Sequence, residues 1–295
     1  MIAQKAFLDN LFSWLWQEYR DRVDYARAYE DILKKCGGNF QNDHLAFRTF
    51  AVQERWSGIA AISRPFEALG YRAAATYDFP DKNLTSIHFA PPVESLPKLF
   101  ISELRTWDLS ARARKIVASA TKKAAPGLTD IELGDLALLS KISGKRRGAL
   151  LRRWAAQFTR PWPAPTLADA LALEKESQFG AWVLLHGHTV NHFTAAVHAH
   201  ASPALDDIEK TIAALKAAGV PMKPDIEGEP GSRLRQSSTQ AVVIPVEMRS
   251  GSRVVKKPWT YAYFEIAERP LVDGRRFEGF LGGQATNLFE MTRRS

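Results

Sequence analysis

Two histidines and one glutamate stand in strand-like runs at distant points of the chain and could together hold a metal ion. His44 opens the run 43–50, His192 opens the run 191–197, and Glu265 lies in the run 259–267. Two imidazoles and one carboxylate that meet in a cavity form a ligand set suited to non-haem Fe(II), with positions left free for substrate and O₂. No short motif joins the three residues, so their spacing alone does not establish the set.

The period of a β-strand sorts the side chains of these runs onto two faces, because successive residues point in opposite directions. In the first run, Leu45 and Phe47 are expected to pack on a helix, which leaves His44 and Arg48 on a free concave face. By the same rule the concave face of the other two runs carries the following side chains: His192, Thr194, Ala196 and His198, then Tyr261, Tyr263 and Glu265.

The elements that must position these residues are predicted to be duplicated. In each half a strand opening on histidine precedes an amphipathic helix that ends at a glycine, Gly70 or Gly219, and three more strands follow. The predicted helix stripes are Ile59, Ile62, Phe66 and Leu69, and then Leu205, Ile208, Ile212 and Leu215; the predicted later strands are 71–77, 84–90 and 99–104, and then 220–223, 240–246 and 259–267. The prediction is an α+β fold of two β-α-β-β-β modules that share one concave sheet.

The rest of the chain is predicted to be helical. The aromatic stretch 7–19 reads as an amphipathic N-terminal helix, and 106–178 reads as helices interrupted by prolines near residue 163. We therefore divide the chain into an N-terminal helix with the first module (1–105), a helical insert (106–180), and a second module with a C-terminal helix (181–295).

Composition excludes some classes of function. The net charge is +8, but much of the excess lies between Arg105 and Arg160 among apolar residues at helical spacing, which favours a solvated helix face over nucleic-acid binding. A single cysteine, Cys36, excludes an internal disulfide and a cysteine-based zinc site, which suits a reducing cytoplasm. No apolar run is long enough to span a membrane. No oligomeric state is predicted.

Three blocks of sequence resemble the 2-oxoadipate dioxygenase/decarboxylase (hydroxyglutarate synthase) family, which has the vicinal oxygen chelate fold. They are Asp43-His44-Leu45-Ala46-Phe47-Arg48-Thr49-Phe50, the run 182–194, and Tyr263-Phe264-Glu265-Ile266-Ala267-Glu268-Arg269. The end of the chain is also similar to 4-hydroxyphenylpyruvate dioxygenase, which shares the fold and the iron chemistry. The resemblance covers nearly the whole chain.

The resemblance implies that His44, His192 and Glu265 bind Fe(II) and that Arg48 is the substrate-binding, catalytic arginine. It implies that O₂ and a 2-oxo dicarboxylic acid, 2-oxoadipate first, are converted to 2-hydroxyglutarate and CO₂, as in lysine catabolism. The family's Gly-Asn-Ala-like run near the C-terminus is here 282–287, a departure that leaves substrate contacts there open.

Other residues and other functions compete with this assignment. Glu268 is expected on the opposite face from Glu265, as a surface or helix-facing partner of Arg269, unless a bulge reverses the two. Glu103 is a candidate fourth ligand that we favour as structural. Of the remaining histidines, His198 is the expected neighbour of the ligands, while His88 is assigned to a core or rim strand and His186, His188 and His200 to hydrogen-bonded loops or the surface. The alternative functions are an aryl-pyruvate or ring-cleaving dioxygenase of the same fold and a non-catalytic small-molecule-binding protein.

Overall fold

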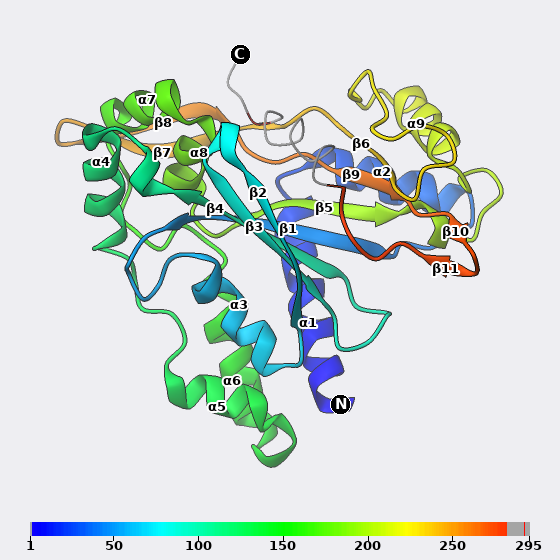
Figure 1. The fold of residues 1–295 in the computed structure, drawn as a ribbon, viewed down its shortest axis with the longest axis horizontal. Helices are drawn as coiled ribbons and strands as arrows, with labels where there is room; N and C mark the ends of the chain where they lie inside the picture. Colours follow the sequence, from blue (N-terminus) through cyan, green and yellow to red (C-terminus); the bar gives the residue numbers. More distant parts are fainter. Residues whose placement is uncertain (1, 282–291, 293–295) are drawn as a thin grey trace.

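The computed structural model describes residues 2–281 and 292, and Figure 1 shows helices arranged around one twisted central sheet. Its α-helices are α1 (Ile2–Arg20), α2 (Asp24–Lys35), α3 (Ile59–Ala68), α4 (Ala111–Thr121), α5 (Asp130–Ala137), α6 (Gly144–Ala155), α7 (Leu167–Glu176), α8 (Gln178–His186) and α9 (Ile208–Ala217). Its strands are β1 (Asn42–Ala51), β2 (Arg72–Phe79), β3 (Leu84–Ala90), β4 (Lys98–Arg105), β5 (Val190–Ala196), β6 (Arg235–Ser238), β7 (Val243–Ser250), β8 (Arg253–Thr260), β9 (Glu265–Glu268), β10 (Leu271–Val272) and β11 (Arg275–Arg276). Short 3₁₀ turns are η1 (Pro80–Lys82), η2 (Thr106–Asp108), η3 (Leu139–Lys141) and η4 (Val197–Ala199).

The first module has the predicted element order, β1-α3-β2-β3-β4. The residues of the predicted helix stripe, Ile59, Ile62, Phe66 and Leu69, are all buried. Gly70 follows the helix with a φ of 101°, a left-handed conformation that glycine adopts at little cost. The predicted α+β architecture with a shared sheet is confirmed, because the main sheet has the strand order β2-β3-β4-β1-β5-β9-β6.

The second module repeats the first, but its outer strands differ from the prediction. Residues 220–223 contribute only an isolated bridge from Met222 to Thr239, and the unpredicted β6 takes the next place in the sheet. The predicted strand 240–246 lies instead in a separate β7–β8 hairpin, and the predicted strand 259–267 is divided between β8 and β9. Pro245 pairs with Pro258 in that hairpin, and proline is excluded from central strands because it has no N–H to donate.

The sheet relates the two modules through their pairing pattern. β1 pairs parallel with β4 and β5 pairs parallel with β9, whereas β1 and β5 run antiparallel at the junction of the modules.

In each module a glutamate side chain binds the first N–H of the helix. Glu103 Oε2 accepts from the N–H of Ile59 at 2.8 Å, and Glu268 Oε1 accepts from the N–H of Ile208 at 3.2 Å. Glu103 is therefore structural, as the sequence favoured.

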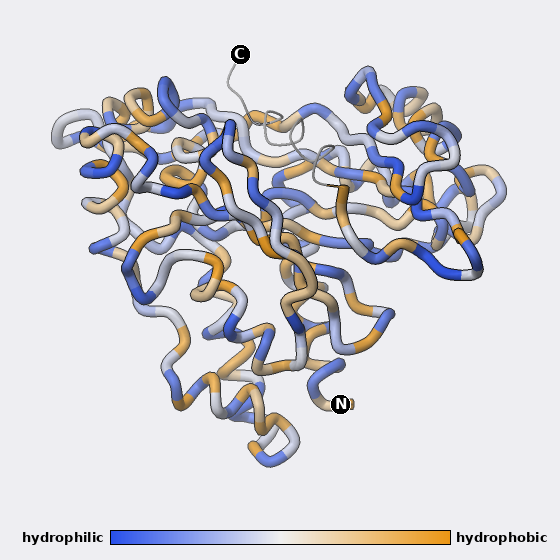
Figure 2. The backbone as a smooth tube through the Cα atoms, in the orientation of Figure 1, coloured by the Kyte–Doolittle hydropathy of each residue, from blue (hydrophilic) through white to orange (hydrophobic). Residues whose placement is uncertain are grey.

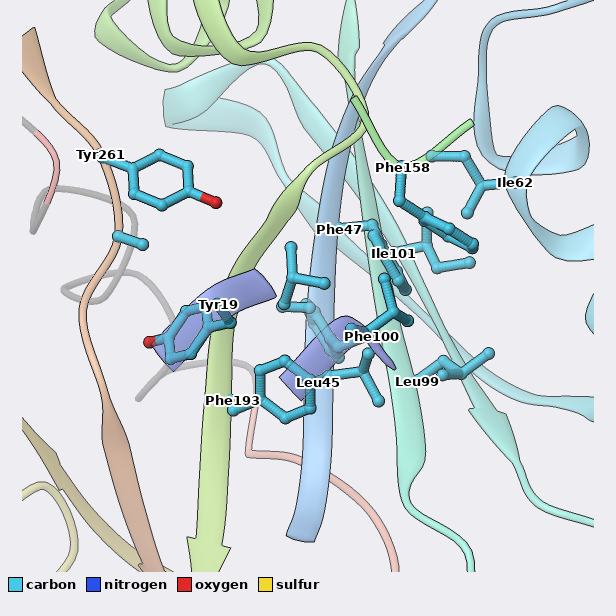
Figure 3. Packing of buried hydrophobic residues seen from close by; sticks show 14 of the residues in the cluster. Tyr19, Leu45, Phe47, Ile62, Leu99, Phe100, Ile101, Phe158, Phe193 and Tyr261 are labelled. Atoms are coloured by element: carbon cyan, nitrogen blue, oxygen red, sulfur yellow. The ribbon is translucent and has the colours of Figure 1, made fainter. Parts of the chain in front are cut away.

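The convex face of the sheet is packed as the alternation of residues predicts. Figure 3 shows Leu45, Phe47 and Phe193 in the apolar cluster beside the α1 residue Tyr19. The ring of Phe47 lies 5.2 Å from that of Phe158, and the ring of Phe193 lies 5.0 Å from that of Tyr19. Helices thus cover one face of β1 and β5 and leave the other face for polar side chains.

Helices α4 to α7 occupy the stretch predicted to be helical. The side chains of Thr129 and Thr166 cap the starts of α5 and α7. Figure 2 shows hydrophilic segments at peripheral turns such as that between β10 and β11, and apolar segments in the central strands.

Among residues 2–281 and 292, no helix has the length and apolar character needed to cross a membrane. The division of the chain at 105 and 180 stays a prediction.

Candidate metal centre

The three candidate ligands meet at the centre of the sheet. His44 comes from β1, His192 from β5 and Glu265 from the start of β9. Glu265 Oε2 lies 3.4 Å from Nε2 of His44 and 3.6 Å from Nε2 of His192, and the ligand atoms of all three lie within 4.8 Å of one another. The structure therefore brings together the side chains that the sequence placed on the concave face.

The chemistry of this cluster fits a metal cation. His44, His192 and Glu265 are at most 7% exposed, and Glu265 is fully buried. Its Oε2 accepts from the hydroxyl of Thr194 at 3.0 Å, whereas its Oε1 has no hydrogen-bond partner among the described residues. A buried carboxylate oxygen without a partner is costly, and a bound cation would remove that cost.

Each histidine is oriented by the residue that precedes it. Asp43 Oδ2 lies 2.8 Å from Nδ1 of His44, and Asn191 Oδ1 lies 3.0 Å from Nδ1 of His192. A hydrogen bond at Nδ1 fixes the tautomer and leaves Nε2 free to bind a metal. Both contacts come from irregularities in the β1–β5 pairing, where Asp43 and then Asn191 is the extra residue. A bulge breaks the alternation of faces and turns these side chains toward their histidines.

Arg269 binds Asp43, the residue that orients His44, and also binds the backbone near the C-terminal end of the described chain. Its Nε and Nη2 donate to Oδ1 and Oδ2 of Asp43 at 2.7 and 3.0 Å, and its Nη1 donates to the carbonyls of Phe277 and Gly279. Burial alone would raise the pKa of Asp43, but Arg269 and His44 outweigh it and hold that pKa well below its usual range. Asp43 is therefore an ionised acceptor for the Nδ1 proton of His44.

We expect the substitution Asp43→Asn to weaken metal binding about 10- to 100-fold, the usual cost of losing an outer hydrogen-bond partner. The change keeps the shape of the side chain but removes the charge that orients His44 and pairs with Arg269. Chelator competition measures the affinity. Asp206→Asn, which alters an exposed carboxylate at the start of α9, is the control. Equal affinity in Asp43→Asn and the unsubstituted protein would show that Asp43 does not orient the ligand.

The pKa values of two of the three candidate ligands, His192 and Glu265, are shifted in the directions that a cation site needs. Burial lowers the pKa of His192 to about 3, so its imidazole is neutral near pH 7. Burial opposes ionisation of Glu265, yet His192 and His44 outweigh it and lower the pKa of that carboxyl. Burial also opposes protonation of His44, but hydrogen bonds to Asp43 and Glu265 raise its pKa. The raised pKa means that a proton competes with a metal for His44 more strongly than it would for a free imidazole.

The pseudo-symmetric partner of Glu265 is a phenylalanine. When His44 is aligned with His192, the strand registers place Phe100 of β4 at the position of Glu265 in β9, and Glu103 at the position of Glu268. The two modules therefore share the glutamates that hold their helices but differ at the residue facing the histidines. A six-coordinate ion with three protein ligands has three coordination positions left open. A bidentate acid would fill two of them and O₂ the third.

The substitution Phe100→Glu is expected to supply a fourth ligand. Metal affinity should rise while turnover falls at least about tenfold, because one position needed by substrate or O₂ is then filled. Isothermal titration with the metal and steady-state kinetics measure the two effects. Phe100→Leu, which removes the ring without adding a ligand, should not raise metal affinity. If both substitutions changed metal affinity alike, residue 100 would not face the ion.

Arg48 lies in the same cavity as the candidate ligands. The cavity is lined by Phe100, Asn191, Tyr263 and Phe280 as well as by His44, His192 and Arg48. Arg48 is 2% exposed; its Nη1 donates to Thr292 Oγ1 at 2.7 Å, and its guanidinium lies over the rings of Phe179 and Trp182. Phe280 closes the other side, with its ring 4.8 Å from that of His44. The cavity is thus apolar, with a buried cation on the same strand as one ligand.

The remaining histidines have partners outside the three-residue cluster. His186 contacts the Thr260 carbonyl, His188 contacts Thr49, and His200 contacts Tyr29 and the Leu205 carbonyl. These contacts confirm hydrogen-bonded roles for the three. His88 is buried in β3 beside Phe280, which agrees with a core or rim assignment. Among the described residues, the side chains that bond to Nδ1 of the ligand histidines are Asp43 and Asn191, and the expectation for His198 stays a prediction.

Glu268 does not compete with Glu265 as a ligand. Glu268 faces helix α9, as expected, but its ion-pair partner is Arg235 at 3.1 Å, and Arg269 pairs with Asp43 instead. The pairings of β9 with β5 and with β6 are regular, so the choice between Glu265 and Glu268 is not reversed. The run 282–287 and the predicted C-terminal helix lie outside the described residues.

Paired β-α-β-β-β modules with a His-His-Glu cluster between them define a protein of the vicinal oxygen chelate class. The structure matches that of a glyoxalase-superfamily protein from Ralstonia eutropha with a TM-score of 0.84 at 26% identity, over 94% of this chain and 86% of that one. It also matches the hydroxyglutarate synthase of Oryza sativa, solved in complex with 2-oxoadipate, with a TM-score of 0.81 at 25% identity, over 99% of this chain and 93% of that one.

The family model for 2-oxoadipate dioxygenase/decarboxylase matches residues 16–290. The chloroplastic 2-oxoadipate dioxygenase/decarboxylase of Arabidopsis thaliana is 30% identical over 318 aligned positions, which cover 99% of this chain and 79% of that protein. The chain belongs to the 2-oxoadipate dioxygenase/decarboxylase family and is an enzyme of this type.

Proposed function

We propose that this protein binds one Fe(II) ion through His44, His192 and Glu265 and uses O₂ to convert 2-oxoadipate to 2-hydroxyglutarate and CO₂. The observation that carries the proposal is a buried His-His-Glu cluster in one cavity with a buried arginine. The family and the 2-oxoadipate bound to the rice relative support the choice of substrate. A cytoplasmic location and a role in lysine catabolism stay predictions.

The ligand residues would hold the ion on one side and leave the cavity side open. His44 and His192 would bind through Nε2, because Asp43 and Asn191 occupy their Nδ1 atoms. The unpartnered Oε1 of Glu265 and its neighbour Oε2 offer the carboxylate oxygen. When bound, Fe(II) would supply the redox chemistry with O₂ that none of these side chains can perform.

The other cavity residues would bind and orient the acid. Arg48 suits the distal carboxylate, because a guanidinium can donate two parallel hydrogen bonds to it. Asn191 accepts with Oδ1 from His192, while its Nδ2 is buried without a partner among the described residues. That N–H group is available to a substrate oxygen. Phe100, Tyr263 and Phe280 would exclude water, which strengthens these polar contacts.

Oxygen uptake by the protein, loaded with Fe(II) under anaerobic conditions, tests this function. We expect consumption of O₂ with 2-oxoadipate, release of CO₂ and formation of 2-hydroxyglutarate, and much slower uptake with 2-oxoglutarate or 4-hydroxyphenylpyruvate. Uptake with 4-hydroxyphenylpyruvate alone would assign the protein to the aryl-pyruvate dioxygenases. No uptake with any acid by protein that retains its iron would overturn the proposed reaction.

A further inference from the structure

A second cavity lies between the first module and the helical region that follows it. Its wall is formed by the β1–α3 loop, helix α3, residues 125–128, helix α6 and the loop after α6. None of its lining residues belongs to the metal cavity. Figure 1 shows α3, α5 and α6 together as one lobe on the side of the sheet where the N-terminus lies.

The lining of this cavity carries positive charge without a carboxylate. Four arginines line it, and no aspartate or glutamate is among the described lining residues; we call it the arginine pocket (Arg55, Arg64, Arg153 and Arg160). Asp130 lies 2.8 Å from Arg55 and 3.5 Å from Arg64, but it is 70% exposed, and Glu132 lies 3.9 Å from Arg153. The Asp130 pairs are exposed and therefore weak, and the Arg153–Glu132 contact is long. Four guanidinium groups against these two carboxylates leave the cavity cationic.

Two of the arginines are held in place by backbone carbonyls, which orient a guanidinium but leave its charge. Nη2 of Arg153 donates to the carbonyls of Pro126 and Gly127 at 2.8 and 3.0 Å. Nη1 of Arg160 donates to the carbonyls of Leu185 and Glu247 at 3.0 and 3.2 Å. The bonds of Arg153 run to residues that themselves line the pocket and so fix this arginine at its wall, which lowers the cost of binding an anion there.

A buried amide and an aromatic ring complete the pocket. Nε2 of Gln157 is buried and has no hydrogen-bond partner in the described part of the chain. The guanidinium of Arg55 lies 4.7 Å from the ring centre of Trp56. A Cβ atom on Gly127 would come within 2.7 Å of that ring, so the glycine lets Trp56 form the wall. The pocket thus offers an unused N–H donor and an apolar surface beside its cations.

We propose that the arginine pocket binds a small organic anion that has an apolar body and a carboxylate or phosphate group. Guanidinium groups recognise both oxyanions through paired hydrogen bonds. The pocket adjoins strand β1, which also carries Arg48. His188 lines the pocket, and its Nε2 lies 3.4 Å from Oγ1 of Thr49 in β1. This site is separate from the metal centre and does not rest on the proposed reaction.

Calorimetric titration of the full chain with benzoate and with phenyl phosphate tests the pocket and distinguishes the two anionic groups. We expect one of them to bind at one site per chain with a dissociation constant near or below about 1 mM. The substitutions Arg55→Gln and Arg64→Gln should each weaken binding about tenfold, since both side chains are about half exposed and their loss should not disturb folding.

Two controls decide where the anion binds. Arg152→Gln changes an exposed arginine on α6 that does not line the pocket and should leave affinity unchanged. His192→Ala should also leave it unchanged, because the metal cavity is elsewhere. The proposal is overturned if neither anion binds up to about 10 mM, if Arg152→Gln weakens binding as much as Arg64→Gln, or if His192→Ala abolishes binding.

Discussion

Replacing His192 by Ala is expected to lower turnover of 2-oxoadipate by at least about a thousandfold, because a metal contributes several kcal/mol to the reaction it assists. The purified variant should contain little iron after the loading that gives the unsubstituted protein one ion per chain. His192 sits in β5, which pairs with β1 on one side and with β9 on the other, so the loss of one imidazole should leave the fold intact. Iron analysis and circular dichroism measure the two effects separately.

His198→Ala is the matched control, since His198 lies a few residues further along the same segment and its Nδ1 has no hydrogen-bond partner among the described residues. We expect it to keep its iron and most of its turnover. If His192→Ala retained a full complement of iron and its activity, His192 would not be a ligand. If both variants lost iron equally, the loss would reflect a general disturbance of the segment.

Arg48→Ala is expected to reduce kcat/KM for 2-oxoadipate about 100-fold, the effect of losing about 3 kcal/mol of charge-assisted hydrogen bonding. The loss should be specific to the distal carboxylate. With 2-oxohexanoate, which has the same chain length but no second carboxylate, the variant and the unsubstituted protein should have similar kcat/KM values.

Arg48→Lys distinguishes charge from geometry in this interaction. A lysine keeps the positive charge but not the paired donors of a guanidinium, so we expect only partial recovery of kcat/KM. Equal losses for 2-oxoadipate and 2-oxohexanoate in Arg48→Ala would contradict a role in binding the distal carboxylate. Such a result would indicate instead that Arg48 supports the cavity through its contacts with Thr292 and the ring of Phe179.

The sequence predicted the parts of the site that depend on local periodicity. The alternation of β1 placed His44 and Arg48 opposite Leu45 and Phe47, and the structure has that arrangement. The glycines at 70 and 219 predicted the ends of two helices, because a left-handed residue at a helix end favours glycine. Local rules of this kind are reliable where a strand is regular and one of its faces is buried.

The sequence did not predict the groups that depend on irregular or distant pairing. Asp43 and Asn191 were missed, because a regular strand would turn each away from the histidine that follows it. The signal was present, since a residue able to accept a hydrogen bond precedes the histidine in both modules. The Asp43–Arg269 pair joins residues far apart in the chain, and no local pattern predicts such a contact.

Polar and proline-containing segments account for the errors in the second module. β6 has the sequence Arg-Gln-Ser-Ser, which lacks the branched and aromatic residues that indicate a strand, yet it pairs with β9. The apolar residues of β7 suggested a place in the sheet, but Pro245 limits that strand to a hairpin. Tertiary pairing decided both cases against local propensity.

Anomalous scattering at the iron edge, recorded from crystals of the Fe(II)-loaded protein, tests the central claim most directly. We predict one strong peak per chain, within coordination distance of Nε2 of His44, Nε2 of His192 and a carboxylate oxygen of Glu265, and no protein ligand from Phe100. A peak bound by other side chains, or a loaded protein with no peak between these three residues, would contradict the account.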